Sequence, residues 1–200
     1  IIRFFKKHQF DIIHSWHWSS DFSEPLAAKL AGIPWLMTKK SMGWGNKAWR
    51  WRSSLSTTII TINSDMNSFY EGIMMNKVYA IPLGVDIDYY SPQFLLKEPL
   101  KEKLSIQESD FVLVSVVNLI PVKGIEILIK GVKELNDASI KLLIVGNDKG
   151  PYADSLKEMS KGNSSISFLG KSLEIRPYHK ISSAFVIPTL DLGEGLPVAP

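Results

Sequence analysis

The sequence predicts an α/β protein with two doubly wound parallel sheets. Segments of strand length alternate with segments of helix length along both halves of the chain. The run over residues 111–117 is continuously apolar, which is typical of a parallel strand covered on both faces. The 200 residues are 45% hydrophobic and 22% charged, an ordinary globular composition that excludes disordered, collagen-like and coiled-coil proteins.

In the first half, local signals separate the elements. Gly32 and Pro34 end a helix, the β-branched residues at 58–62 favour a buried strand, and Ser64 is expected to be the N-cap of a helix. In order, we expect a strand over 10–14, a helix over 24–31, a strand over 35–38, a helix over 47–56, a strand over 58–62, a helix from Ser64 to Glu71 and a strand over 78–82.

The periodicity is lost between residues 85 and 108, where Pro92 and Pro99 interrupt a polar stretch, so this segment is the expected linker. The predicted domains are therefore residues 1–84 and 109–200. In the second domain we expect a strand over 111–117, a helix over 124–135, a strand over 141–145, a helix over 152–160 and strands over 166–169 and 184–188.

Charge and aromatic residues also divide the chain. Residues 1–84 hold ten Lys or Arg against five Asp or Glu, whereas residues 85–200 hold thirteen against fifteen. All six tryptophans lie between Trp16 and Trp51. The two halves are therefore expected to have different functions.

Several protein classes are excluded or disfavoured. The absence of cysteine excludes disulfides, thiolate catalysis and cysteine-bound zinc, and it fits a reducing compartment. The longest apolar run, over 111–122, is interrupted and too short to cross a bilayer. The first residues lack the order of a signal peptide.

Ligands of open α/β sheets bind at the carboxyl ends of the strands, so functional residues are expected in the loops that follow the strands. The sequence NLIPVKG over 118–124 places Lys123 at the entrance of a helix, where backbone N–H groups attract anions. A cation there is unfavourable unless it meets an anion such as phosphate. A phosphate-binding lysine and a solvated lysine are equally supported by this loop alone.

Two further segments hold candidate site residues. Gly193 and Gly195 flank Glu194 in a stretch that suits either hydroxyl binding or an ordinary turn, and the turn is favoured on this motif alone. His14 and His17 make only a weak metal site, since no cysteine or clear carboxylate accompanies them.

The stretch over 39–52 is basic and rich in tryptophan. It suits nucleic acid, an anionic membrane or a phosphorylated substrate, and a solvated helix with inward tryptophans is the simpler alternative. Nucleic acid is disfavoured because the second half is net acidic and has no basic stripe. Its GWGNKA match to a dinucleotide fingerprint is discounted because Trp44 is bulky and the match lies away from a strand.

The order of these segments resembles retaining glycosyltransferase family 4, the group 1 glycosyltransferases, whose members have the GT-B fold of two Rossmann-like domains. DIIHSWH over 11–17 is similar to a segment of the family's acceptor domain, and IPLGVD over 81–86 to the stretch that closes it. The loop over 118–124 resembles the donor-phosphate loop, with Asn118 where arginine is common. EGLP over 194–197 resembles the start of the Glu-x7-Glu motif.

The resemblance implies a metal-independent enzyme without a cofactor that moves a hexose-type sugar, with retention, from a nucleotide-diphosphate sugar to a glycan, polysaccharide or lipid-linked hydroxyl acceptor. It implies a cytoplasmic protein of polysaccharide biosynthesis, with possible peripheral contact to an anionic membrane and no nucleic-acid partner. A catalytically inactive sugar- or phosphate-binding module is the alternative.

Missing family motifs at both ends lead us to expect an internal fragment, with part of the acceptor-side domain in 1–84 and part of the nucleotide-sugar domain in 109–200. The implied residues are Lys123, Glu194 and His17 for catalysis, Asn118, Gly124, Gly146, Lys171, Gly195 and Leu196 for the donor, and Lys39, Lys40, Trp44 and Arg50 for the acceptor or membrane side.

Overall fold

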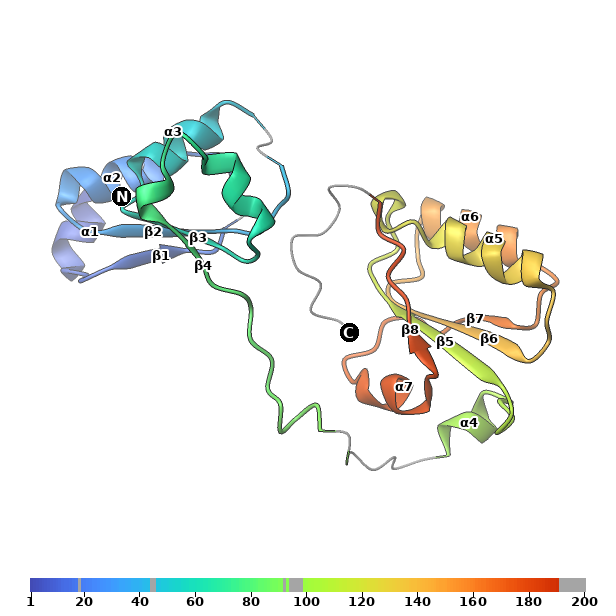
Figure 1. Cartoon of the computed structure of the whole chain (residues 1–200). Helices are drawn as coiled ribbons and strands as arrows, with labels where there is room; N and C mark the ends of the chain where they lie inside the picture. Colours follow the sequence, from blue (N-terminus) through green and yellow to red (C-terminus); the bar gives the residue numbers. More distant parts are fainter. Residues whose placement is uncertain (18, 44–45, 92, 94–98, 191–200) are drawn as a thin grey trace. The chain divides into compact units, whose positions relative to one another are not determined.

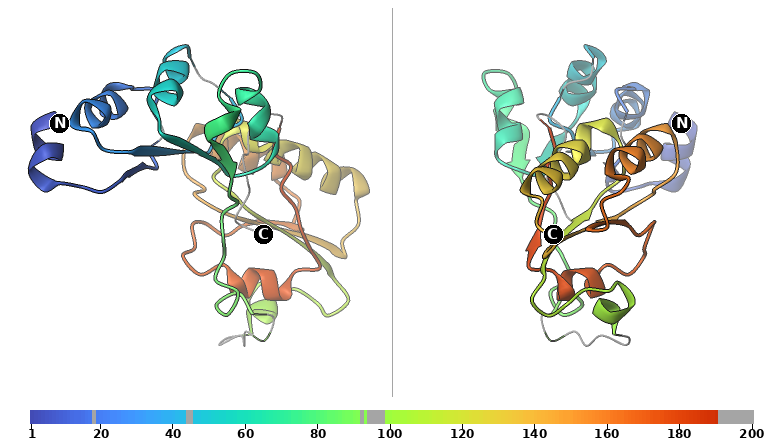
Figure 2. Two further views of the ribbon diagram at one scale, coloured as in Figure 1. Left: turned by 60° about the vertical axis from the view of Figure 1, so that its left-hand side comes forward. Right: turned by 90° about the vertical axis from the view of Figure 1, so that its right-hand side faces the viewer.

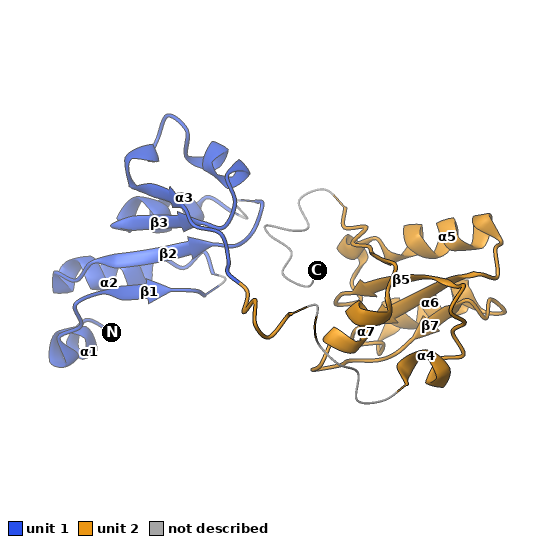
Figure 3. Cartoon of the chain, turned by 60° about the horizontal axis from the view of Figure 1, so that its bottom comes forward, with its two compact units in different colours: residues 1–84, 194–196 blue, residues 85–193, 197–200 orange. Residues whose placement is uncertain are grey.

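The chain folds into two compact units that divide between Gly84 and Val85 (Figure 3). The structure is a computed structural model, and it describes residues 1–17, 19–43, 46–91, 93 and 99–190 (Figure 1). Unit 1 holds residues 1–84 and unit 2 begins at Val85.

Unit 1 is a parallel sheet whose strands follow the order of the chain, β1-β2-β3-β4. Trp35 and Met37 are two positions apart on β2 and therefore point to the same face of the sheet. There they pack with residues of the three α-helices of unit 1, including Phe5, Ala28 and Trp49. Its elements are α1 (Ile2–His8), β1 (Ile13–Ser15), α2 (Ser23–Ala31), β2 (Trp35–Lys39), α3 (Ala48–Leu55), β3 (Thr58–Thr61), the 3-10 helices η1 (Asp65–Tyr70) and η2 (Met75–Lys77), and β4 (Val78–Ala80).

Unit 2 is a second parallel sheet, with the strand order β7-β6-β5-β8. Along the chain it contains α4 (Leu100–Lys103), β5 (Phe111–Val116), the 3-10 helix η3 (Pro121–Lys123), α5 (Ile125–Leu135), β6 (Ile140–Val145), α6 (Pro151–Ser160), β7 (Ile166–Phe168), α7 (Arg176–Ile181) and β8 (Ala184–Phe185).

The sheet of unit 2 is covered on both faces. Leu142 and Ile144 of β6 pack against α5 and α6, which lie side by side on one face. Leu143 and Val145 point the other way and join a cluster with residues from α4 and α7 (Figures 1 and 2). Apolar side chains on both faces explain why β5 and β6 are apolar without alternation.

Several local predictions differ from the structure. The strands expected over 10–14 and 184–188 are shorter, at Ile13–Ser15 and Ala184–Phe185. Helices α1 and α7 were not predicted, and η1 is a 3-10 helix rather than an α-helix. Ser64 is the N-cap of η1, as predicted, but its side chain makes no capping hydrogen bond; instead the Asn63 side-chain oxygen accepts a hydrogen bond from the Met66 N–H at 2.9 Å. Within the expected linker lies α4, followed by Ile106, which is buried in unit 2.

The start of the expected linker is tied to unit 2 by Tyr89. The Tyr89 hydroxyl donates to the Glu174 carboxylate at 3.0 Å, and the Arg176 guanidinium stacks on the Tyr89 ring at 3.6 Å. Arg176 also donates to the Tyr89 carbonyl at 3.1 Å and pairs with Glu174. The hydrogen bonds that the Glu174 carboxylate accepts, from Arg176 above all and also from Tyr89, lower the pKa of Glu174 to about 2. Residues 85–91 therefore belong structurally to unit 2.

Candidate functional site

The sheet of unit 2 has one point where the strand order reverses. The chain runs from β5 outward to β6 and β7, and then returns to place β8 on the other side of β5. Ligands of open α/β sheets bind at the carboxyl ends of the strands beside such a point. The predicted loop over residues 118–124 follows β5 directly.

This loop holds Lys123 at the entrance of α5. Asn118 is exposed, Lys123 is half-buried at the end of η3, and Gly124 is buried with a φ of 63°. Burial lowers the pKa of Lys123. The left-handed backbone of Gly124 turns the chain from η3 into α5, which explains the glycine after Lys123.

The segment after β8 packs against this loop. The Leu190 N–H donates to the Val122 carbonyl at 2.9 Å. A Cβ atom on Gly124 would lie 2.2 Å from the Pro188 carbonyl oxygen, so the two backbones meet there. The structure thus brings the Lys123 loop beside the segment that leads to Glu194, Gly195 and Leu196. Those three predicted residues lie outside the described residues.

Gly146 and Lys171 follow the neighbouring strands. Gly146 comes after β6, and its N–H donates to the Gly170 carbonyl at 2.9 Å. A Cβ atom on Gly146 would lie 1.9 Å from the Val117 carbonyl oxygen. Lys171 is exposed and follows Gly170 beyond β7. Asn118, Gly146 and Lys171 therefore follow adjacent strands at the carboxyl edge of the sheet. Gly146 is also required for packing, because a larger residue there would collide with the Val117 backbone.

The sequence did not single out Asp148, which lies in the loop after β6. Its carboxylate binds the Lys157 ammonium at 2.8 Å, and this bond lowers the pKa of Asp148. Nine positions separate the pair, and one partner is in a loop, so helical spacing gives no signal for it. The pair fixes the loop that follows Gly146 to α6.

In unit 1, the His14 ring lies near the carboxyl end of β1, and both of its nitrogens have hydrogen-bond partners. The Trp16 indole N–H donates to His14 Nδ1 at 3.2 Å, and His14 Nε2 lies 2.8 Å from Thr38 Oγ1. Because indole is only a donor, Nδ1 is the acceptor and the neutral ring carries its proton on Nε2. His17, the predicted catalytic histidine, is exposed three residues further on.

Lys39 is not on the acceptor or membrane surface predicted for it. Its side chain is 1% exposed, Nζ donates to the Gly43 carbonyl at 2.6 Å, and the rings of Phe69 and Trp49 lie 4.6 and 5.6 Å away. Lys39 ends a strand whose side chains are covered by the following loop and α3, so its neighbours in sequence do not share its environment. Burial lowers its pKa to about 8.

The other members of this group differ. Lys40 and Arg50 are exposed, with Lys40 Nζ 5.8 Å from the Trp16 ring, while Trp44 lies outside the described residues. Trp51 is 65% exposed and Trp49 only 8%, so these two tryptophans lie on different faces of α3.

Lys39 gives a testable pH dependence. Above pH 8 the folded chain loses the Lys39 proton, whereas the unfolded chain keeps it until about pH 10.5. The unfolded state then binds more protons, so stability rises with pH in this window. Relative to Lys39→Met, the wild-type free energy of unfolding is expected to gain about 2–3 kcal/mol between about pH 7.5 and pH 10.5.

Urea unfolding followed by tryptophan fluorescence measures this, since every tryptophan lies in unit 1. Lys40→Met, at the exposed neighbouring position, is the matched control and should show no comparable gain. Parallel pH curves for wild type and Lys39→Met would contradict the prediction.

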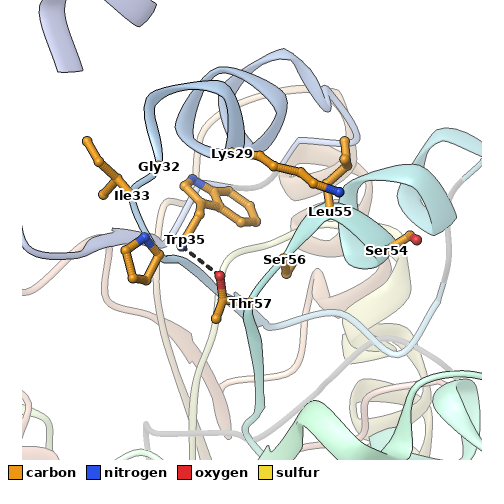
Figure 4. Close-up of a pocket in the computed structure, with 9 residues that line it drawn as sticks. Lys29, Gly32, Ile33, Trp35, Ser54, Leu55, Ser56 and Thr57 are labelled. Carbon is orange, nitrogen blue, oxygen red and sulfur yellow. Dashed lines mark hydrogen bonds between the residues drawn. The ribbon is translucent and has the colours of Figure 1, made fainter. Parts of the chain in front are cut away.

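A pocket of about 410 Å³ in unit 1 lies at the other edge of the sheet (Figure 4). It is bordered by Lys29 and Gly32 at the end of α2 and by residues 54–57 after α3, and the Trp35 N–H donates to Thr57 Oγ1 at 3.2 Å. This is the amino-terminal edge of β2 and β3, opposite the edge where α/β proteins bind ligands. No predicted site residue lines it.

Two family models match the chain. The model described as Glycosyl transferases group 1 matches residues 97–200, and the one described as Glycosyltransferase Family 4 matches residues 1–89. The chain is 25% identical over 226 residues to the Escherichia coli UDP-Gal:alpha-D-GlcNAc-diphosphoundecaprenol alpha-1,3-galactosyltransferase, with 100% of this chain and 56% of that protein covered.

Solved structures share the fold. A glycosyltransferase from Rickettsia africae matches with a TM-score of 0.79 and 20% identity, over 94% of this chain and 54% of its own. Anabaena HepE, solved in complex with UDP, matches with a TM-score of 0.79 and 16% identity, over 94% of this chain and 56% of its own. The chain thus spans about half the length of these relatives.

Among the helices of the described ranges, none has the length and apolar character needed to cross a membrane. The two parallel sheets and the structural likenesses show the GT-B fold. Because the first family model matches more than half of the residues of this chain, the chain belongs to the glycosyl transferases group 1.

Proposed function

We propose that the complete protein transfers a hexose-type sugar from a nucleotide-diphosphate donor to a hydroxyl acceptor, with retention of configuration and without a divalent metal. The observation that carries this proposal is the seating of the Lys123 loop against the segment after β8, at the switch point of unit 2. Membership of the glycosyl transferases group 1 gives the reaction class.

The hard part of this reaction is the departure of a nucleoside diphosphate while positive charge develops on the sugar. Lys123 and the first-turn N–H groups of α5 would stabilise the charge on the leaving phosphates. Asn118 offers a neutral hydrogen bond at the position where an arginine would add a second cation. In this proposal Glu194 holds sugar hydroxyls, and His17 faces the sugar from the acceptor side.

The donor we favour is a UDP-sugar. The E. coli relative is named for a UDP-Gal donor, and HepE was solved with UDP. We further place the protein in the cytoplasm and in the assembly of a polysaccharide or other glycan.

Calorimetry on the full-length protein with UDP, GDP and ADP, followed by a sugar-transfer assay with UDP-sugars, tests the proposal. We expect UDP to bind most tightly and sugar to be transferred with retention in the presence of a chelator. Binding of UDP-sugar without turnover on any acceptor would favour the alternative, an inactive sugar- or phosphate-binding module with Asn118 in place of the second cation.

For the acceptor we propose a lipid-linked phosphosugar reached at an anionic membrane. The E. coli relative is named for a diphosphoundecaprenol acceptor. In unit 1, Lys40, Lys47 and Arg50 are exposed, and Trp51 exposes 65% of its surface close to them in the sequence. Lysine and arginine suit lipid phosphates, and a tryptophan suits the boundary between headgroups and acyl chains.

Vesicle co-sedimentation provides the test. The triple variant Lys40→Gln, Lys47→Gln, Arg50→Gln should bind anionic vesicles about a hundredfold more weakly than wild type at low salt, since each basic residue near such a surface contributes about 1 kcal/mol. Replacing the exposed Lys130, Lys149 and Lys161 of unit 2 is the charge-matched control. Equal wild-type binding to neutral and anionic vesicles, or none to either, would remove the membrane contact.

A further inference from the structure

Arg52 is a buried cation in the basic stretch over residues 39–52. It lies on α3, its side chain is 2% exposed, and its guanidinium stacks 4.7 Å from the centre of the Trp35 ring. Burial lowers its pKa, which means that its charge is poorly solvated. A cation in such a place is destabilising unless its hydrogen bonds are made in good geometry.

These hydrogen bonds reach both ends of one loop. Arg52 Nη1 donates to the Asp21 carbonyl at 2.5 Å, and Nη2 donates to Ser15 Oγ at 2.7 Å. Ser15 is the last residue of β1, and Asp21 lies just before α2. Nη2 also lies 3.8 Å from the Glu24 carboxylate in the first turn of α2. One side chain therefore joins the end of β1, the end of the loop and the start of α2.

The described residues of the loop between these anchors are 16, 17 and 19–21. Trp16 contacts His14 and Lys40, and Asp21 accepts hydrogen bonds from Ser23. Trp16, His17 and Asp21 are exposed, and the Asn46 amide donates to Ser20 Oγ at 3.0 Å from another loop. The loop follows β1 at the carboxyl edge of the sheet and carries His17. A loop with this little buried surface needs fixed ends to hold a side chain in one place.

We propose that Arg52 is a positioning residue, which fixes both ends of the loop that carries His17, the histidine that the proposed function assigns to the reaction. This inference rests on the proposed function. The planar guanidinium suits the task because it directs two N–H groups at two separate acceptors, which a lysine ammonium on a flexible stem cannot reproduce. Displacement of a reacting group by about 1 Å can lower a rate by about a hundredfold.

The test compares Arg52→Lys with Ser15→Ala in the full-length protein. Ser15→Ala removes one acceptor of Arg52 and leaves the buried cation in place, so it remains informative if Arg52→Lys fails to fold. Arg3→Lys, at an exposed position of unit 1, is the control. We expect kcat to fall at least about tenfold in Arg52→Lys and less in Ser15→Ala, with the KM for the donor unchanged.

A double-mutant cycle with His17→Ala separates positioning from general stability. If Arg52 acts through His17, Arg52→Lys should have no further effect on kcat in the His17→Ala background. Full additivity, or wild-type kcat in both Arg52→Lys and Ser15→Ala, would overturn the proposal even if the melting temperature fell.

Hydrogen exchange gives a readout that does not depend on activity. The amides of residues 16–21 should exchange faster in Arg52→Lys than in wild type, while those of β3 should not. Unchanged exchange in the loop would overturn the proposal. If the wild-type protein transfers no sugar, the proposed function fails, and the exchange measurement alone decides whether Arg52 holds this loop.

Discussion

Gly146→Ala is expected to destabilise unit 2 by about 3 kcal/mol or more. The new Cβ atom would lie 1.9 Å from the Val117 carbonyl oxygen and 3.1 Å from its carbon, so backbone must move. The strand ends that meet there are joined by hydrogen bonds from Val117 N to Val145 O and from Gly146 N to Gly170 O. Movement of Val117 would also displace Asn118, which begins the Lys123 loop.

The chain supplies its own controls for this measurement. Gly131 lies in α5 with open space around it, so Gly131→Ala should be neutral or stabilise by about 0.5–1 kcal/mol. Urea unfolding by circular dichroism would follow both units, while tryptophan fluorescence follows unit 1 alone. A Gly146→Ala protein with an unchanged unfolding curve would show that the strand ends can separate without loss.

Lys123→Ala in the full-length protein is expected to weaken nucleoside-diphosphate binding about ten- to a hundredfold, because a charge-assisted hydrogen bond contributes about 1.5–3 kcal/mol. The site is partly shielded from water, since burial already lowers the pKa of Lys123. Calorimetry with UDP and GDP provides the measurement.

Lys130→Ala is the matched control, because Lys130 is an exposed lysine on α5. It should bind both nucleotides as wild type does. Unchanged affinity of Lys123→Ala for UDP and GDP alike would show that the loop after β5 is not the phosphate site.

The longer helices were predictable because their burial is periodic, and β5 and β6 because each is a continuous apolar run of strand length. Ile125, Ile129 and Val132 lie on one face of α5 and are buried, as their spacing indicates. Helix α7 has only six residues and no such period, and it depends on the packing of Ile181 under the sheet. Helix α1 buries only Phe5 and has no side-chain cap. Tertiary packing decides such short helices, and local sequence does not encode it.

The candidate site was predictable where it follows from strand order. The loop that carries Lys123 follows β5 and Gly146 follows β6, and the alternation of strands and helices is enough to find those strand ends. Lys39 was misplaced because a run of basic residues was treated as one surface, and the burial of Arg52 was not predicted. The run crosses a strand, a loop and a helix, so its members meet different neighbours. The contact of Arg52 with Ser15 joins positions far apart in the chain, and no local pattern indicates it.

The short β8 has a consequence for the order of folding. Leu113 pairs with Ala184, so β8 joins β5 by closing a loop of about 70 residues, and it gains just two paired residues. Long-range parallel pairing is slow because loop closure precedes any gain. The β5–β6 ladder, with six register pairs, needs no such wait. The switch point is therefore expected to form late and to open early, and a ligand bound across the Lys123 loop and the segment after β8 would slow that opening.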